Sequence, residues 1–272
     1  MRYFIYLSYK GTRYHGWQIQ ANANTVQSEV NRALSVLLNE KIETTGAGRT
    51  DTGVHASCFV AHFDSGQYES YAAGSSAEYV VHKLNCLLPV DICVHAIQPV
   101  TAAAHARFDA VQRTYKYYVN TKKNPFHTEF AAFVPFELNV AAMNEAAQLL
   151  FDCTDFTSFA KLHAQTKTNC CRIAQAKWDA TADGLVFTVS ADRFLRNMVR
   201  AIVGTLIDVG RGKITCDDMR RIIEQKNRCT AGNSAPAHGL WLTDIQYKTG
   251  QASSSPYKEH LSDFRMSYAP QQ

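Results

Sequence analysis

Hydrophobic positions in the first hundred residues follow two different periods. From Tyr3 to Tyr9 both alternating sets are mostly apolar, which predicts a strand buried on both faces. From Thr25 apolar residues recur every three or four positions, which predicts a helix, and we expect Tyr79 to face the core from a second helix. The predicted strands are 3–9, 42–45, 59–63 and 92–100, and the predicted helices are 25–38 and 76–87. This β-α-β-β-α-β order is that of a ferredoxin-like unit.

The same order of elements returns in the second part of the chain. The predicted strands are 113–119, 173–178, 185–189 and 240–247, and the predicted helices are 140–151 and 193–209. No sequence repeat accompanies this order, so the duplication rests on the elements alone. We expect an α+β fold of two ferredoxin-like halves, residues 1–105 and 106–248, which form one continuous, mainly antiparallel sheet with helices on one face. The tail 249–272, rich in Ser, Pro and Gln, is expected to be peripheral.

Composition restricts the class of protein. Of the 272 residues 46% are hydrophobic and 19% are charged, which is enough apolar material for a core and argues against disorder. No apolar run approaches the roughly 20 residues that a membrane span needs, which favours a cytoplasmic protein. The net charge of +4 permits a nucleic-acid partner without requiring one. The cysteines and histidines show no spacing typical of metal ligands, and no glycine-rich nucleotide-binding motif is present.

One glycine-rich loop has the composition of a catalytic site. Residues 46–56 read GAGRTDTGVHA, so three glycines surround Arg49 and Asp51. Such a loop can hold a carboxylate in a fixed place, with a cation near enough to keep it ionised. The alternative is a surface turn with an incidental ion pair.

Basic residues are predicted along one edge of the helix 193–209. Arg193, Arg196 and Arg200 have the spacing i, i+3 and i+7, and Arg211 and Lys213 follow the end of the helix. A row of this kind can bind phosphate groups. A solvated helix face would have the same pattern.

Two further segments are typical of nucleotide binding. Residues 106–117 (ARFDAVQRTYKY) interleave basic residues with aromatics, which suit phosphates and unpaired bases respectively, although a strand with its tyrosines inward would look similar. Loop 230–240 consists mostly of small residues, and His238 within it fits a hydrogen-bonded loop histidine better than a catalytic one. Gly204 interrupts the predicted helix at a cost of about 1 kcal/mol relative to alanine, which indicates close packing or the approach of a ligand.

Six motifs occur in a specific order from about Met1 to Tyr247. They are YKGTRYHGWQIQ (9–20), GRTDTGVHA (48–56), RTYKY (113–117), DFTSF (155–159), FLRNMVR with VGTL (194–206), and APAHGL (235–240). With these motifs the chain resembles the TruA family of tRNA pseudouridine synthases. One such string would be weak evidence, whereas six in order are specific.

The resemblance implies isomerisation of uridine to pseudouridine at positions 38, 39 and 40 of the tRNA anticodon stem-loop, by a homodimer and without a cofactor or metal. Asp51 would be the nucleophile, attacking either the uracil ring or the ribose carbon. Arg200 would pair with Asp51, and Tyr115 would stack on the flipped uracil and help to remove the proton from the new carbon–carbon linkage. Arg49 would also help to keep Asp51 ionised. The remaining candidates for substrate binding are Arg193, Arg196, Arg211 and Lys213.

Two other functions fit parts of the sequence. Asp51-Thr52-Gly53 matches the triplet of aspartic proteases, but that chemistry needs two carboxylates that share a proton. No second Asp-Thr-Gly occurs, and a neighbouring Arg49 would oppose proton sharing. A non-catalytic RNA-binding module would explain the arginines and aromatics, but not the glycine-rich loop around Asp51.

Overall fold

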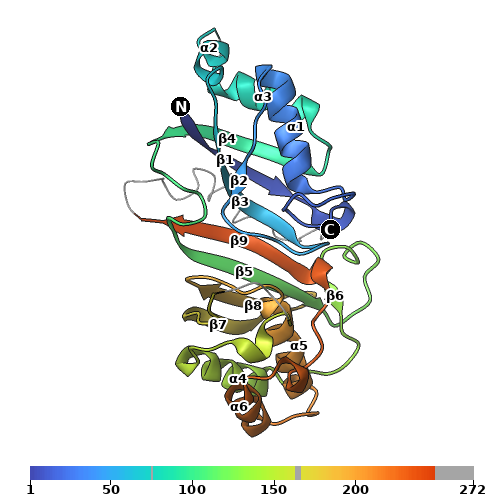
Figure 1. The fold of residues 1–272 in the computed structure, drawn as a ribbon. Coiled ribbons are helices and arrows are strands. Elements are labelled where there is room, and N and C mark those ends of the chain that lie inside the picture. Colours follow the sequence, from blue (N-terminus) through green and yellow to red (C-terminus); the bar gives the residue numbers. More distant parts are fainter. Residues whose placement is uncertain (75, 163–166, 249–272) are drawn as a thin grey trace.

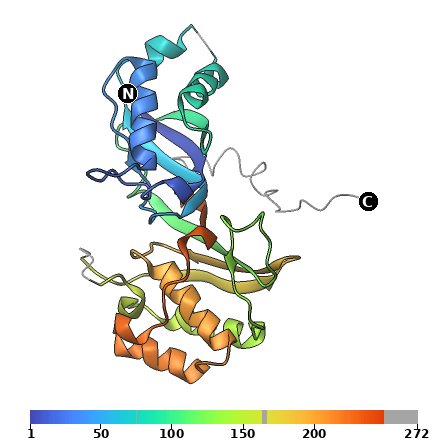
Figure 2. The ribbon, with the colours of Figure 1, turned by 90° about the vertical axis from the view of Figure 1, so that its right-hand side faces the viewer.

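One sheet passes through both predicted halves in the computed structural model, which describes residues 1–74, 76–162 and 167–248 (Figures 1 and 2). Its strands lie in the order β4-β1-β3-β9-β5-β8-β7, with β2 beside β3 and β6 beside β5. Neighbours pair antiparallel except in the short β3–β9 and β5–β6 pairs. The strands are β1 (Arg2–Tyr9), β2 (Thr45–Gly46), β3 (His55–Asp64), β4 (Ile92–Val100), β5 (Ala110–Asn120), β6 (Ala132–Phe133), β7 (Ile173–Ala180), β8 (Gly184–Ala191) and β9 (Leu240–Tyr247). The predicted α+β fold with a continuous, mainly antiparallel sheet is confirmed.

Helices gather at the two ends of the molecule, with the central strands between them (Figures 1 and 2). The first group is α1 (Val26–Leu38), α2 (Tyr68–Ala72) and α3 (Ala77–Leu87). The second group is α4 (Val140–Asp152), α5 (Met198–Gly210) and α6 (Cys216–Gln225). The sequence pattern did not predict α2 and α6. The predicted tail 249–272 lies outside the described residues.

Two hydrophobic clusters fill the molecule, and they interlock where the predicted halves meet. Leu242 and Ile245 of β9 belong to the cluster around β1, β3 and α1. Val54, which precedes β3, belongs to the cluster around β5, β8 and α5. Each half therefore contributes apolar side chains to the core of the other.

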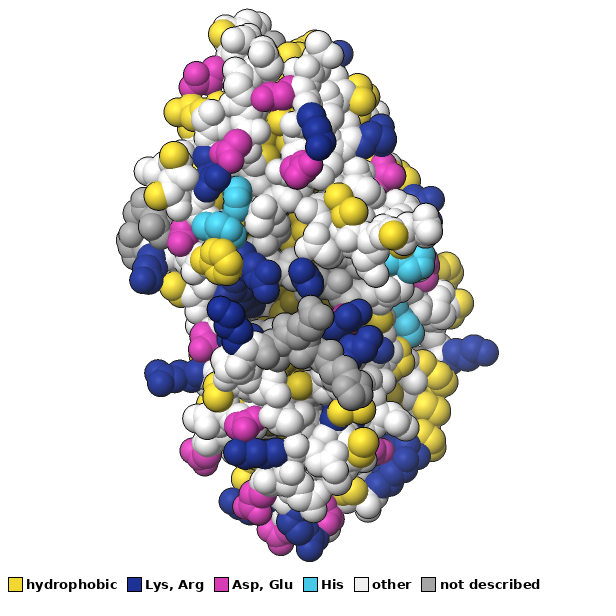
Figure 3. All heavy atoms as spheres, viewed as in Figure 1, with side chains coloured by type: hydrophobic (Ala, Val, Ile, Leu, Met, Phe, Trp, Pro, Cys, Tyr) yellow, Lys and Arg dark blue, Asp and Glu magenta, His cyan; other side chains and the backbone are white. Residues whose placement is uncertain are grey.

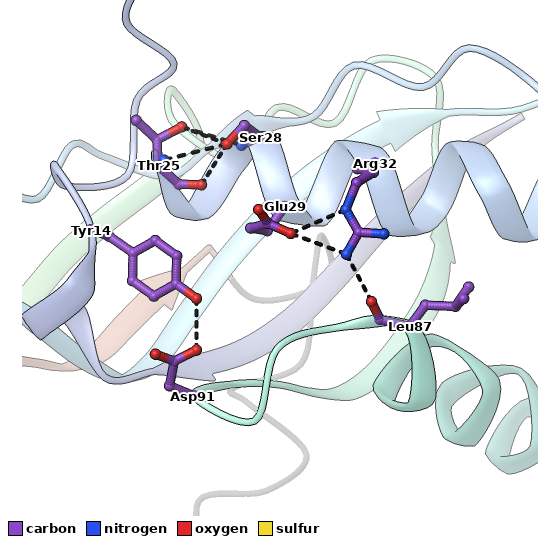
Figure 4. A network of polar contacts seen from close by, with 7 residues as sticks. All are labelled: Tyr14, Thr25, Ser28, Glu29, Arg32, Leu87 and Asp91. Atoms are coloured by element: carbon purple, nitrogen blue, oxygen red, sulfur yellow. Dashed lines mark hydrogen bonds and ion pairs between the residues drawn. The ribbon is translucent and has the colours of Figure 1, made fainter. Parts of the chain in front are cut away.

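Capping and a side-chain bridge fix helix α1 (Figure 4). The Thr25 hydroxyl accepts a hydrogen bond from the Ser28 backbone, and the Ser28 side chain bonds back to the backbone of Thr25, which is a capping box. Farther along, the Arg32 guanidinium donates to the carbonyl oxygen of Leu87 at 2.8 Å. Because Leu87 ends α3, this contact ties α1 and α3 together beside the sheet.

The predicted strand over 42–45 is wrong, because only Thr45–Gly46 pairs with β3. The backbone before it bonds to side chains of α1 instead. Ile42 N–H donates to Ser35 Oγ at 2.9 Å, and Thr44 N–H donates to Asn31 Oδ1 at 3.0 Å. Polar side chains of the helix thus replace the neighbouring strand as hydrogen-bond partners.

Two further details of the predicted helices are wrong. Helix α5 begins at Met198, not at Arg193, because Asn197 has a left-handed backbone with φ of 66° that interrupts a continuous helix. Arg193 and Arg196 therefore lie in an irregular segment before α5. Tyr79 is 45% exposed rather than buried, and its ring lies under the Lys83 ammonium on the outer face of α3.

Candidate active site

The loop that carries Asp51 depends on glycines for its shape. Gly53 has a φ of +78°, which favours glycine, and Val54 N–H donates to the Asp51 carbonyl at 3.1 Å to close the turn. Gly16, with a φ of +84°, lies so close that a Cβ atom there would be 2.2 Å from the Thr50 carbonyl oxygen. The carboxylate of Asp51 stays partly exposed. The loop therefore holds the Asp51 carboxylate in a fixed position in which it remains accessible.

The segment after β1 is hydrogen-bonded to the loop that carries Asp51. The Tyr14 carbonyl accepts a hydrogen bond from Gly53 N–H at 3.3 Å, and the Tyr14 hydroxyl donates to Asp91 at 2.6 Å (Figure 4). The hydroxyls of Tyr9 and Thr50 are 2.9 Å apart in a buried hydrogen bond. These contacts explain why the first and second motifs of the sequence are both needed to build the site.

His55 connects the Asp51 loop to three other segments. Its Nδ1 accepts the Gly11 N–H at 3.0 Å, which leaves the proton on Nε2. Nε2 then donates to the carbonyl oxygens of Glu129 at 2.8 Å and His238 at 3.1 Å. Burial lowers the pKa of His55 to about 4, so the ring is neutral at physiological pH. The motif drew attention to Asp51, and nothing in the spacing pointed to this role of His55.

Two arginines from the other half of the chain face Asp51. Arg200 Nη1 lies 4.0 Å from Asp51 Oδ2, and Arg196 Nε lies 3.5 Å from Asp51 Oδ1. The Arg200 side chain is 22% exposed and the Arg196 side chain is 60% exposed. Arg200 Nε also donates to the carbonyl oxygen of Ala235 at 2.6 Å, which fixes its direction. The Arg200 guanidinium is thus fixed in its direction by a hydrogen bond, whereas the Arg196 guanidinium is largely exposed to solvent.

The loop before β9 packs directly on α5 at Gly204. A Cβ atom on Gly204 would lie 1.8 Å from the Asn233 carbonyl oxygen. One residue earlier in the same loop, Gly232 N–H donates to Thr205 Oγ1 of α5 at 3.0 Å. Close packing therefore explains the glycine inside this helix, and it brings Ala235 to Arg200.

Tyr115 stands on β5 beside the carboxylate. Its ring meets the ring of Phe194 edge to face, with centroids 5.1 Å apart. Burial, and then the negative charge of Asp51, raise the pKa of Tyr115 above the ordinary value, so its phenol keeps its proton at neutral pH. Tyr115, Arg200 and Asp51 are thus brought together from three separate motifs.

Arg113 is turned inward, although its place in the motif would also fit a phosphate contact. Its guanidinium donates to the Ala47 carbonyl of the Asp51 loop at 3.1 Å and to the Asp192 carbonyl, before α5, at 2.9 Å. It also donates to the carbonyls of Arg107 and Ala110, each at 2.7 Å. Arg113 therefore fixes the Asp51 loop relative to the segment that carries Arg196. Ala110 and Arg107 are close to Arg113 in the sequence, but no periodicity could have predicted the two distant acceptors, Ala47 and Asp192.

Comparison with known proteins shows the family of this chain. A family model described as tRNA pseudouridine synthase matches residues 146–248. A tRNA pseudouridine synthase A of Parabacteroides distasonis is 54% identical over 246 residues, which is 90% of this chain and 96% of the relative. The protein of that name from Bacteroides thetaiotaomicron is 52% identical over 264 residues, 96% of both chains, and that from Bacillus subtilis is 41% identical over 251 residues, 91% of this chain and 99% of the relative. The chain belongs to the tRNA pseudouridine synthase A family.

Membership of the tRNA pseudouridine synthase A family extends over the whole candidate site. The family model matches the part that holds Arg196 and Arg200. The Bacteroides thetaiotaomicron relative covers 96% of this chain, so its aligned region also includes Asp51 and Tyr115. The resemblance expected from the sequence motifs is confirmed.

The remaining predicted substrate-binding residues lie at different distances from Asp51. Arg49 is exposed and lines a pocket of about 100 Å³ together with Arg107. Among the described residues, the guanidinium groups within 4.0 Å of Asp51 are those of Arg196 and Arg200, not that of Arg49. Arg193 is partly buried just before α5.

Arg211 and Lys213 lie at the far end of α5. At 1.5 Å per residue, Arg211 is roughly 16 Å along the helix from Arg200. Its guanidinium lies 3.7 Å from the ring centroid of Phe136, and Lys213 pairs with Asp208 at 3.3 Å. These two residues are therefore separate from the Asp51 site.

Lys and Arg side chains gather across the middle of the molecule, over the central strands (Figure 3). Within the described ranges, no three His, Cys, Asp or Glu residues are grouped so as to hold a metal ion. In the same ranges, none of the helices has the length and apolar character that a membrane crossing requires. Among the described residues, none of the eight cysteines forms a disulfide.

Proposed function

We propose that this protein isomerises uridine to pseudouridine in tRNA. The observation that carries the proposal is family membership along nearly the whole chain, with relatives named tRNA pseudouridine synthase A. The Asp51 carboxylate, which faces two guanidinium groups beside a tyrosine, supplies a site for this chemistry. The target uridines are positions 38, 39 and 40 of the anticodon stem-loop, as the motifs imply.

Asp51 acts as the nucleophile in this proposal. The guanidinium groups of Arg200 and Arg196 face its carboxylate and place positive charge beside the reacting group. The uridine leaves its stack to reach Asp51, which costs a few kcal/mol. The bond between N1 and the ribose carbon breaks, a bond from C5 to that carbon forms, and the C5 proton leaves while N1 gains one. Substrate and product have the same atoms, so the reaction consumes no oxidant or reductant.

Tyr115 stacks on the flipped uracil. To accept the C5 proton it would first have to lose its own, which burial and the neighbouring Asp51 oppose. Its environment therefore favours stacking. The arginines beside Asp51 also count against an aspartic protease, because cations oppose the sharing of one proton between two carboxylates.

The finer architecture belongs to the same proposal. The strand orders β4-β1-β3-β2 and β9-β5-β8-β7 support two ferredoxin-like halves, residues 1–105 and 106–248, with helices on one face. The enzyme works in the cytoplasm as a homodimer that binds one tRNA across both subunits. Arg49, Arg193, Arg196, Arg211 and Lys213 are the proposed contacts to the RNA.

The test uses the purified protein and an unmodified tRNA transcript with uridines at 38, 39 and 40. After incubation, pseudouridines are mapped by carbodiimide modification and primer extension. We expect stops at one or more of these positions and none in a transcript with cytidines there. A transcript that acquires no pseudouridine would overturn the proposed reaction, and modification elsewhere would overturn the proposed target.

A further inference from the structure

An exposed phenylalanine stands on a turn between β4 and β5, outside the Asp51 site. Phe108 is 76% exposed. The turn beneath it is closed by hydrogen bonds, because His105 N–H donates to Asp109 Oδ2 at 2.7 Å and Asp109 N–H donates to the His105 carbonyl at 3.1 Å. The backbone N–H groups of Arg107 and Phe108 both donate to His105 Nδ1, at 3.1 and 3.3 Å. The ring is therefore presented on a rigid support.

The histidine below Phe108 covers one face of its ring. The centroids of His105 and Phe108 are 4.2 Å apart, with 33° between their planes. His105 in turn packs against the His62 ring at 4.6 Å. With one face supported in this way, the high exposure of Phe108 belongs to its other face. A flat apolar face that is open to solvent can accept a second ring in a stacked arrangement.

One cation lies over this ring, and a second lines a pocket that they share with the Asp51 loop. The Arg107 guanidinium carbon lies 6.0 Å from the Phe108 centroid. Arg107 also lines the pocket of about 100 Å³ that includes Arg49 of the Asp51 loop. Lys and Arg side chains also gather across the middle of the molecule (Figure 3). An aromatic face beside arginines is the combination that binds unpaired nucleotides.

The turn is fixed relative to the Asp51 loop. The Arg113 guanidinium donates to the Arg107 carbonyl at 2.7 Å and to the Ala47 carbonyl at 3.1 Å. A single, partly buried side chain thus holds both segments at a set spacing. An RNA that reaches Asp51 would meet Phe108 in a defined position.

We propose that Phe108 stacks on an unpaired base of the substrate RNA, while Arg107 and Arg49 bind the adjoining phosphates. This base is distinct from the uridine that reaches Asp51 and Tyr115. The inference rests on the proposed function for the identity of the RNA. Phe108 thereby serves as a second point of contact that places the stem-loop on the enzyme.

Substitution of Phe108 tests the contact by affinity. Phe108→Ala should weaken binding of a labelled tRNA transcript about tenfold and raise KM by more than it changes kcat, because base stacking on an aromatic ring contributes at about this level. Phe108→Tyr should retain wild-type affinity. The control is Phe151→Ala, an exposed phenylalanine at the end of α4 with Asp152 as its neighbour. Equal affinities for wild type and Phe108→Ala would overturn the proposal.

A spectroscopic variant tests the stacking itself. In Phe108→Trp, the added tryptophan should be quenched by iodide in the free protein and shielded from it in the complex with tRNA. The tryptophan of Phe151→Trp should stay equally accessible in both. Fully paired duplex RNA should bind wild type and Phe108→Ala equally well. Loss of affinity for duplex and stem-loop alike, or no shielding of the new tryptophan, would contradict stacking on an unpaired base.

The two proposals fail in distinguishable ways. If wild type converts no uridine but Phe108→Ala still weakens binding of the stem-loop, the proposed reaction is wrong and the stacking contact stands. If wild type makes pseudouridine and Phe108→Ala binds as tightly as wild type, the reaction stands and the contact is wrong.

Discussion

Arg200 and Ala235 are joined by hydrogen bonds in both directions. Arg200 Nε donates to the Ala235 carbonyl at 2.6 Å, and Ala235 N–H donates to the Arg200 carbonyl at 2.9 Å. The guanidinium is thereby held with Nη1 directed to Asp51, 4.0 Å away. A small-residue loop far along the chain thus sets the position of the cation in the site.

Replacement of Arg200 by lysine should show whether the reaction needs only the positive charge of this residue or also the position of its guanidinium. A lysine keeps the positive charge but has one nitrogen, which cannot bond Ala235 and face Asp51 together. We expect Arg200→Lys to lower kcat at least tenfold with less than a threefold change in tRNA affinity, measured by single-turnover kinetics and filter binding. Arg221→Lys, on the surface of α6, is the matched control. An unchanged rate would mean that Arg200 contacts only phosphate.

Asp51→Asn should abolish pseudouridine formation and leave tRNA binding nearly intact. The amide has almost the same shape as the carboxylate, but it is a far weaker nucleophile. Product is measured by carbodiimide modification and primer extension, because pseudouridine and uridine have the same mass. Asp179→Asn, which alters an exposed ion pair with Lys177, should be fully active. Pseudouridine made by pure Asp51→Asn would rule out Asp51 as the nucleophile.

Stability should fall as the pH decreases from about 6.5 to 4. Burial lowers the pKa of His62 and of His55 to about 4, so in this window these rings take up protons in the unfolded chain but not in the folded one. Each proton contributes a slope of about 1.4 kcal/mol per pH unit.

Urea unfolding at several pH values measures this slope. In His62→Asn the amide oxygen can accept the Ala106 N–H that His62 Nδ1 accepts at 3.1 Å. In this variant the slope of the unfolding free energy against pH, taken near pH 5, should decrease by about 1.4 kcal/mol per pH unit, which corresponds to one proton. A slope equal to that of the wild type would show that His62 titrates alike in both states.

Gly204→Ala should destabilise the protein by about 3 kcal/mol, because the new methyl group would overlap the Asn233 carbonyl at 1.8 Å and backbone must move. Gly210→Ala is the matched control within α5. Its methyl group would meet the flexible Met143 side chain at 2.5 Å, so it should cost less. Thermal unfolding of both variants measures the difference. Equal stability of Gly204→Ala and Gly210→Ala would mean that the backbone of loop 230–240 can move away from α5 at little cost in free energy.

The sequence predicted most elements because their side chains have clear periods, as in α1 and β5. It placed element boundaries wrongly where a side chain bonds to backbone or where one residue has a left-handed backbone. The segment before β2 is held by Ser35 and Asn31 of α1, and Asn197 delays the start of α5. These are local hydrogen bonds and backbone angles, which do not change the hydrophobic pattern.

The same distinction applies to the site. Motifs drew attention to Asp51, Tyr115 and Arg200 because their residue types fit the chemistry. His55 and Arg113 could not be assigned in this way. Both bond to backbone carbonyls, and every residue type offers the same carbonyl acceptor, so the sequence does not mark the partner. Their role exists only once the chain has folded and brought distant segments together.

The β3–β9 pairing that joins the halves is only two residues long, His55 with Trp241 and Ala56 with Leu242. Asp51 lies on one side of this seam and Arg200 on the other. A chain in which one half alone has folded would hold either a carboxylate without its cations or cations without the carboxylate. The carboxylate and the two guanidinium groups that face it therefore come together only once the chain on both sides of this seam has folded.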